Sequence, residues 1–101
     1  MIVISGIARL FESEVERTVH AASAMAATSR DEAGCIDYRF AIDIDDPLVG
    51  HLFEVWESND ALDAHFGSAH FAAFSEILIN AVDGSAEFTR YEVASAAPLF
   101  G

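Results

Sequence analysis

A long β-hairpin in the middle of the chain is the strongest pattern in the sequence. Apolar and polar residues alternate from Cys35 to Ile44, and this period of two predicts a strand. The segment Asp45–Leu48 follows, with a proline in a position that favours a turn. A second strand is predicted over Val49–Glu57, and two strands joined by so short a turn pair antiparallel.

The same alternation assigns the faces of the hairpin. In its first strand, one face is expected to carry Ile36, Tyr38, Phe40, Ile42 and Ile44. In its second strand, Leu52, Glu54 and Trp56 share a face. Arg39 and Glu54 lie on neighbouring strands, so we expect them to form an ion pair inside a dimer rather than to act in catalysis.

Strands and helices on either side complete the fold. Ile2–Leu10 is apolar at nearly every position, which predicts a strand buried on both faces. A helix should begin at a capping box formed by Ser13 and Glu16 and end near Arg30. After the hairpin we expect two helices separated by Gly67-Ser68, and then a last strand. Their predicted bounds are Ala61–Phe66, Ala69–Ala81 and Glu87–Ala94.

The order β-α-β-β-α-β predicts one α+β domain over residues 1–101 with a ferredoxin-like βαββαβ fold. Its four-stranded antiparallel sheet would carry helices on one face only. The other face is too apolar to be left in water, so we expect a second copy to cover it and the chain to form a homodimer. Residues 95–101 form a short tail, which is a candidate contact with the partner subunit.

Charge and composition exclude several classes of partner. The formal net charge is −12, from 17 acidic residues against five arginines, so phosphate backbones and anionic membrane surfaces are repelled. No apolar run reaches the length of a membrane span. Cys35 is the single cysteine, which fits a reducing, cytoplasmic environment. No glycine-rich phosphate loop is present, which argues against a tightly bound NAD or nucleotide.

Motifs along the chain resemble those of the antibiotic biosynthesis monooxygenase family of dimeric α+β barrel proteins. They occur in the family's order and at natural spacing, and they are Glu32-Ala33-Gly34-Cys35, Asp46-Pro47, Glu54-Val55-Trp56-Glu57-Ser58, Ala61-Leu62-Asp63-Ala64-His65 and Ser68-Ala69-His70-Phe71. The resemblance implies a pocket between sheet and helices. It also implies oxygenation of a small aromatic, such as an anthrone or a quinol, without metal or flavin. A deprotonated phenol or enol can reduce dioxygen directly, so such a pocket needs a base and exclusion of bulk water.

Six residues are candidates for that pocket. Histidine as a residue type titrates near neutral pH, so His65 and His70, which flank the helix break, are each a candidate catalytic base. The candidate substrate-binding residues are aromatic, and they are Tyr38, Trp56, Phe66 and Phe74. The two histidines lack a third ligand at a suggestive spacing, so no metal site is predicted.

Three alternatives stay open or are set aside at this stage. The chain could be a binding or stress-associated dimer without catalysis, or a small isomerase that uses one histidine as a proton shuttle. Haem-degrading relatives carry an asparagine, a tryptophan and a histidine at positions that fall near Ser5, His65 and Ser75 here. These residues match poorly, so we expect neither haem nor any other cofactor.

Overall fold

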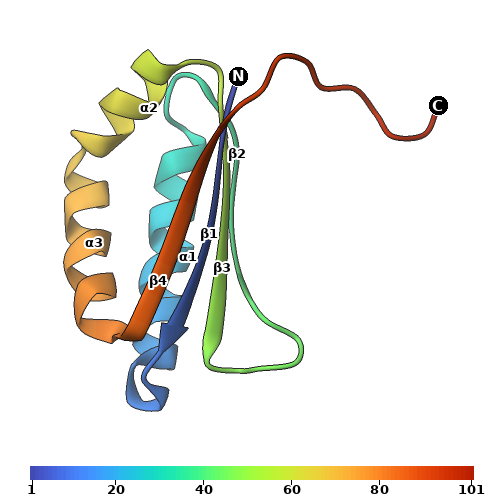
Figure 1. Cartoon of the computed structure of the whole chain (residues 1–101). Helices are drawn as coiled ribbons and strands as arrows, with labels where there is room; N and C mark the ends of the chain where they lie inside the picture. Colours follow the sequence, from blue (N-terminus) through green and yellow to red (C-terminus); the bar gives the residue numbers. More distant parts are fainter.

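The computed structural model describes all 101 residues, and its elements follow the predicted order (Figure 1). A 3-10 turn at Glu12–Glu14 precedes the first helix. The strands and helices are β1 (Ile2–Leu10), α1 (Val15–Arg30), β2 (Cys35–Ile42), β3 (Val49–Trp56), α2 (Asn59–Phe66), α3 (Ala69–Ala81) and β4 (Val82–Glu92). The α+β class and the ferredoxin-like arrangement are therefore confirmed.

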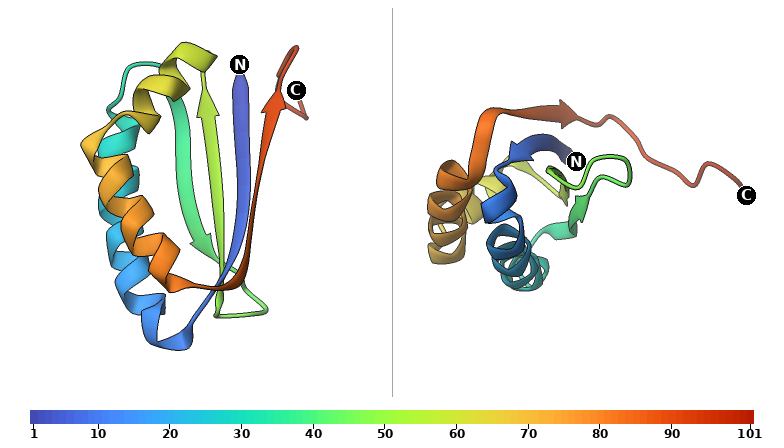
Figure 2. Two further views of the ribbon diagram at one scale, coloured as in Figure 1. Left: turned by 60° about the vertical axis from the view of Figure 1, so that its left-hand side comes forward. Right: turned by 90° about the horizontal axis from the view of Figure 1, so that it is seen from below.

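The four strands form one antiparallel sheet in the order β2-β3-β1-β4. All helices lie against one face of this sheet, as the side view in Figure 2 shows. No helix is both long enough and apolar enough to cross a membrane.

Alternation along β1 separates the two faces of the sheet. Ile2, Ile4 and Leu10 are buried toward the helices, whereas Ser5 and Ile7 are exposed on the outer face. Thus β1 is buried strongly on one side only. This differs from the prediction of a strand buried on both faces, because in the single chain nothing covers the outer face.

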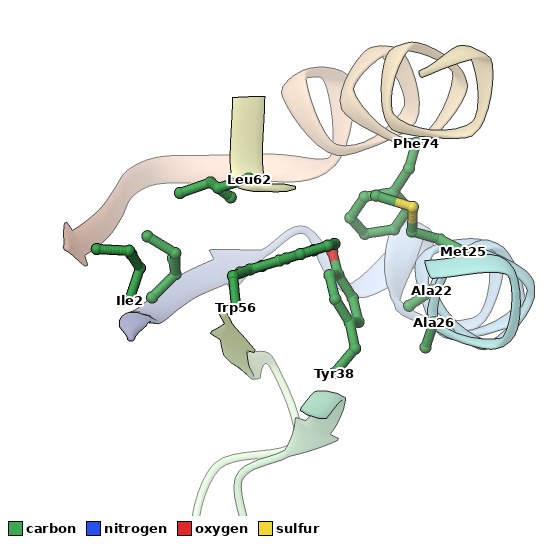
Figure 3. Close-up of a cluster of buried hydrophobic side chains, with 9 residues drawn as sticks. Ile2, Ala22, Met25, Ala26, Tyr38, Trp56, Leu62 and Phe74 are labelled. Carbon is green, nitrogen blue, oxygen red and sulfur yellow. The ribbon is translucent and has the colours of Figure 1, made fainter. Parts of the chain in front are cut away.

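The core lies between the sheet and helices α1 to α3. Trp56 and Leu62 are completely buried in it, and Tyr38 packs edge-on against Trp56 with 6.5 Å between ring centroids (Figure 3). Met25 from α1 and Phe74 from α3 reach toward these rings from the helix layer. Truncation of a buried side chain as large as Leu62 to alanine typically costs about 2–5 kcal/mol.

An irregularity at the start of β2 changes the predicted faces. Cys35 is opposite Trp56, but Asp37 is opposite Val55, so Ile36 is an extra residue in this strand. Ile36 is therefore half exposed instead of buried with Tyr38. Ile44 lies beyond the strand end and is 98% exposed. The predicted apolar face is therefore correct only for the residues between Ile36 and Ile44.

The predicted ion pair between Arg39 and Glu54 is wrong. Arg39 is opposite Phe53 in the register and points to the outer face, where its Nε binds Asp37 Oδ1 at 2.9 Å. Glu54 belongs to the helix-facing side, opposite Tyr38 and Ile4. The strand alternation places the two side chains on opposite faces, so they cannot meet.

Two helix starts behave differently from each other. The capping box at Ser13 does not form: α1 begins after Glu14, and no side chain caps it. At the later break, Ser68 Oγ accepts the Phe71 N–H at 3.2 Å, as expected for a cap of α3. The last strand also begins earlier than predicted, directly at the end of α3.

The tail after β4 runs away from the body of the chain (Figures 1 and 2). Leu99 and Phe100 are almost fully exposed. Its predicted contact with a partner subunit stays a prediction.

Candidate functional site

A cavity of about 560 Å³ lies between the sheet, α3 and β4. Its walls are mostly apolar and include Met25, Tyr38, Phe74 and Leu78. Phe66, Ile79 and Phe88 line the cavity and are also exposed, so they mark its mouth. The volume falls in the range of about 300–1,000 Å³ that is usual for small-molecule sites.

Two charged residues, Glu54 and Arg90, face this apolar space from the sheet. Both are opposite Ile4, one on each neighbouring strand, so they lie in one row on the same face. Two strand spacings separate their backbones by about 10 Å. Arg90 Nη1 donates to Asn59 Oδ1 at 3.0 Å, which holds the guanidinium at the α2 end of the sheet.

Glu54 is the only acidic residue at the cavity wall, and it is 4% exposed. Burial first, and the nearby charge of Glu32 second, raise the pKa of its carboxyl to about 7. A hydrogen bond from Trp56 Nε1 to Oε1, 2.9 Å long, opposes the rise because it stabilises the ionised form. The result is a carboxyl that gains and loses its proton near neutral pH.

Tyr38 also faces the cavity and is almost completely buried. Burial raises the pKa of its hydroxyl above the usual value, and the charge of Glu54 adds to the rise. Tyr38 is therefore a neutral hydroxyl at the wall, able to donate a hydrogen bond.

His65 lies behind Glu54, away from the cavity lining, and is completely buried. Its Nδ1 is 2.7 Å from Glu32 Oε1. Its Nε2 is 3.8 Å from Glu54 Oε1 and has no hydrogen-bond partner. The ring stacks obliquely on Trp56, with centroids 4.7 Å apart. His65 thus lies between the cavity carboxyl of Glu54 and the partly exposed carboxyl of Glu32.

His70 Nε2 hydrogen-bonds the same Glu32 Oε1 and lies 3.2 Å from Ser68 Oγ. The donor atoms of Glu32, His65 and His70 lie within 4.8 Å of one another, so together they could hold one metal ion. Here both imidazoles bind a single carboxylate oxygen, so hydrogen bonding already accounts for the cluster.

The loop that carries Glu32 passes close to α2 at Gly34. Gly34 has φ of +83°, a conformation that suits glycine, and its carbonyl accepts the Glu57 N–H at 2.8 Å. A Cβ at this position would lie 2.5 Å from the Ala61 Cβ. The loop can therefore approach α2 closely only with glycine here.

The structure divides the six candidate residues into two groups. Tyr38, Phe66 and Phe74 line the cavity. Trp56, His65 and His70 do not, and they form a layer behind Glu54. Sequence reasoning missed Glu32, Glu54 and Arg90 as site residues. The first two stand inside the motifs that carried the resemblance, so their place in those motifs was an available signal.

Comparisons with known proteins agree with this fold. Residues 1–77 match the sequence model of the family described as antibiotic biosynthesis monooxygenase. The chain is 31% identical over 98 residues to the uncharacterized protein sll1783 of Synechocystis, covering 97% of this chain and 67% of that protein.

Solved structures share the same fold. A conserved protein of unknown function and possible oxidoreductase from Bacteroides thetaiotaomicron superimposes with a TM-score of 0.85 at 27% identity, over 91% of this chain and 96% of that one. A "putative antibiotic biosynthesis monooxygenase" from Deinococcus radiodurans gives a TM-score of 0.89 at 21% identity, with both chains fully covered.

The family match covers three quarters of the chain and includes Glu32, Glu54, Trp56, His65 and His70. The same chain has the βαββαβ topology and a cavity with a buried carboxyl at its wall. This chain belongs to the antibiotic biosynthesis monooxygenase family.

Proposed function

We propose that the cavity binds a small phenolic or enolic aromatic, quinol-like or anthrone-like, and that the chain catalyses its oxygenation by dioxygen without a cofactor. The observation that carries this proposal is Glu54, a carboxyl at the wall of an apolar cavity with a pKa raised to about 7. Such a carboxyl is ionised often enough at neutral pH to act as a base, and it is basic enough to take a phenolic proton.

The chemistry needs no further reagent for an anthrone-like substrate. Glu54 removes a proton, and the resulting anion passes one electron to dioxygen. The substrate radical and superoxide combine to form a C–O bond, and the hydroperoxide then loses water to leave a carbonyl. One oxygen atom enters the product and the other enters water, so a CH2 group and O2 become C=O and H2O. Apolar walls favour this route because they exclude bulk water.

Arg90 is suited to stabilise the anion that forms. It faces the cavity from the same row as Glu54, and no other cationic side chain lines the space. A substrate with oxygen atoms on opposite sides of one or two fused rings would reach both groups. Tyr38, Phe66 and Phe74 supply the remaining contacts, with the Tyr38 hydroxyl as donor.

His65 and His70 remain candidates for catalysis in this proposal, but not through direct contact with substrate. Trp56 acts on the catalytic base, because its N–H stabilises the ionised form of Glu54. The Trp56 N–H and the charge of Glu32 act on the ionisation of Glu54, and Glu54 does the proton transfer at the cavity.

Oxygen uptake with anthrone or menadiol under air tests the proposal. We expect the wild-type chain to exceed a protein-free control, and Glu54→Gln to lower the rate at least about tenfold. Glu76→Gln, an exposed acid on α3, is the matched control and should keep full activity. Ligand-dependent thermal stabilisation without uptake for either substrate would instead favour a binding module.

We also infer that a second copy of the chain covers the outer face of the sheet. Exposed apolar side chains on that face include Ile7, Phe53 and Tyr91, each exposed by 43% or more. They come from three adjacent strands and lie close to one another in the register. Phe53 is opposite Ser5, and Ile7 is two residues from Ser5 along β1. Tyr91 is opposite Val3, which is two residues from Ser5 in the other direction. Burying such a patch removes apolar area from water at about 25 cal/mol per Å².

A further inference from the structure

The imidazole of His65 has one nitrogen that nothing in the chain satisfies. Glu32 Oε1 lies 2.7 Å from Nδ1, and because a carboxylate only accepts hydrogen bonds, Nδ1 carries the proton of the neutral ring. Nε2 is then a bare acceptor, completely buried and without a partner. A buried polar atom left unpaired is destabilising, and it calls for an explanation.

Nε2 faces the carboxyl of Glu54. Its distance of 3.8 Å from Oε1 is longer than a hydrogen bond, so the proposed contact requires the carboxyl to turn toward the ring. When Glu54 is protonated it carries an O–H, which is the donor that Nε2 lacks. Glu54 can therefore form a hydrogen bond with His65 Nε2 only after it has taken a proton.

We propose that His65 accepts at Nε2 the proton that Glu54 removes from the substrate, and holds it as an imidazolium between Glu54 and Glu32 until the oxygenated intermediate takes it back. This inference rests on the proposed function of the cavity. It extends that function by assigning a second proton acceptor behind the base.

The proton balance of the step is closed. The O–H bond of the phenol or of the enol tautomer of an anthrone breaks, its electron pair stays on the substrate anion, and the proton moves to the Glu54 carboxylate and then to Nε2. Because oxygenation to a carbonyl and water releases no net proton, the same proton must return when the peroxide oxygen is protonated. Between these two events, His65 holds the proton as an imidazolium.

The groups around His65 favour this role. A carboxylate faces each ring nitrogen, Glu32 at Nδ1 and Glu54 at Nε2, so a positive ring would be paired on both sides. The other neighbours are rings from β2, β3, α2 and α3, and they are Tyr38, Trp56, Phe66, His70 and Phe71. Among them only His70 can carry a positive charge, and it is hydrogen-bonded to Glu32.

Glu32 is a positioning residue in this arrangement. It fixes the tautomer of His65, as the aspartate of a Ser-His-Asp triad fixes its histidine, and it never reaches the cavity. His70 hydrogen-bonds the same oxygen from the partly exposed side of the cluster. Arg90, the charged group that shares the row of Glu54, lines the cavity wall instead.

Binding of p-nitrophenol tests the inference without oxygen chemistry, because its ionised form is coloured. We expect the bound phenol to ionise more readily than free p-nitrophenol, by about tenfold in the ionisation constant. In the same complex, ¹⁵N NMR of labelled histidine should show His65 as an imidazolium. A complex that holds phenolate while His65 stays neutral would overturn the proposal.

Variants separate storage of the proton from a structural role of the ring. His65→Gln should return the ionisation of the bound phenol toward its free value, and His20→Gln, on the exposed face of α1, should leave it unchanged. Should His65→Gln fail to fold, Glu32→Gln keeps an acceptor for Nδ1 but removes the charge, and it should reduce the imidazolium signal. An unchanged signal in a folded Glu32→Gln chain counts against the proposal.

The proposed oxygenation can fail separately. In one outcome, p-nitrophenol ionises with His65 protonated, but neither anthrone nor menadiol consumes oxygen. This would support the role of His65 as proton acceptor and would contradict the oxygenase function for those substrates. If oxygen is consumed normally by His65→Gln at every pH, the oxygenase function stands and the role of His65 as proton acceptor does not.

Discussion

Trp56 donates its indole N–H to Glu54, with Nε1 and Oε1 2.9 Å apart, so the only tryptophan of the chain touches the only carboxyl that lines the cavity. The two residues are separated by one position on β3 and project from the same face. The indole therefore experiences directly whether Glu54 is charged.

Trp56 fluorescence should consequently report the titration of Glu54. We expect a transition in intensity or wavelength with a midpoint near the pKa of about 7. In Glu54→Gln the transition should vanish while the folded emission remains. A wild-type profile that is flat through the neutral range would contradict the raised pKa of this carboxyl.

Stability should fall as pH rises toward neutrality. The pKa of Glu54 is raised from 4.5 to about 7 on folding, so between these values the folded state binds more protons than the unfolded state. The free energy of unfolding therefore decreases as pH rises through this window, by up to about 3 kcal/mol. Urea denaturation at several pH values measures it. Glu54→Gln should flatten this dependence, whereas an equal slope in both chains would assign it to other groups.

Gly34→Ala should destabilise the chain by more than backbone conformation alone requires. Its φ is +83°, and the new Cβ would meet the Ala61 Cβ at 2.5 Å. Gly84→Ala is the matched control, because Gly84 has φ of +81° but no neighbour within 4 Å. We expect a loss of about 1–2 kcal/mol for the control and a larger loss for Gly34→Ala.

Combining Gly34→Ala with Ala61→Gly separates the two contributions. Removing the Ala61 methyl should restore the part of the loss that comes from the contact, in thermal unfolding of the double variant. Equal melting points for Gly34→Ala and Gly84→Ala would show that the contact with α2 contributes nothing.

Arg90→Gln should weaken binding of an ionised phenol more than that of a neutral one. Its guanidinium is the only cation at the cavity wall, so we expect an affinity loss of about tenfold for p-nitrophenolate and little change for neutral naphthalene. Titration by fluorescence gives both values. Arg9→Gln, which loses only a pair with Asp46 at an exposed site, is the control.

The mass in solution tests the inferred homodimer. The chain is 10.9 kDa, so sedimentation should give about twice this mass. Phe53→Glu places a charge in the middle of the exposed outer face and should shift the protein toward the single-chain mass while leaving the core intact. A wild-type mass equal to that of one chain would overturn the dimer.

The fold followed from the sequence because its signals are local. The alternation in β2 and β3 and the Gly67-Ser68 break each act within a few residues, and each predicted its element. The extra residue at Ile36 could not be predicted, since a bulge is visible only when the partner strand is in place.

The site was harder to predict because its contacts are distant in sequence. Glu32 meets His65 across 33 positions and His70 across 38, through a loop whose path depends on Gly34. Alternation did place Glu54 and Trp56 on one face. It could not show that burial, rather than a cation, would set the ionisation of Glu54.

The junction between α3 and β4 has a consequence for how quickly molecules enter and leave. Ala81 ends the helix, Val82 begins the strand, and the Ala81 carbonyl accepts the Phe11 N–H at 2.9 Å. This corner of the cavity is therefore fixed by covalent and hydrogen bonds and cannot open as a loop lid. Exchange depends instead on rotation of the exposed rings of Phe66 and Phe88, which such side chains complete within nanoseconds. Ligand release in the single chain should accordingly be limited by affinity, and not by a slow opening of the backbone.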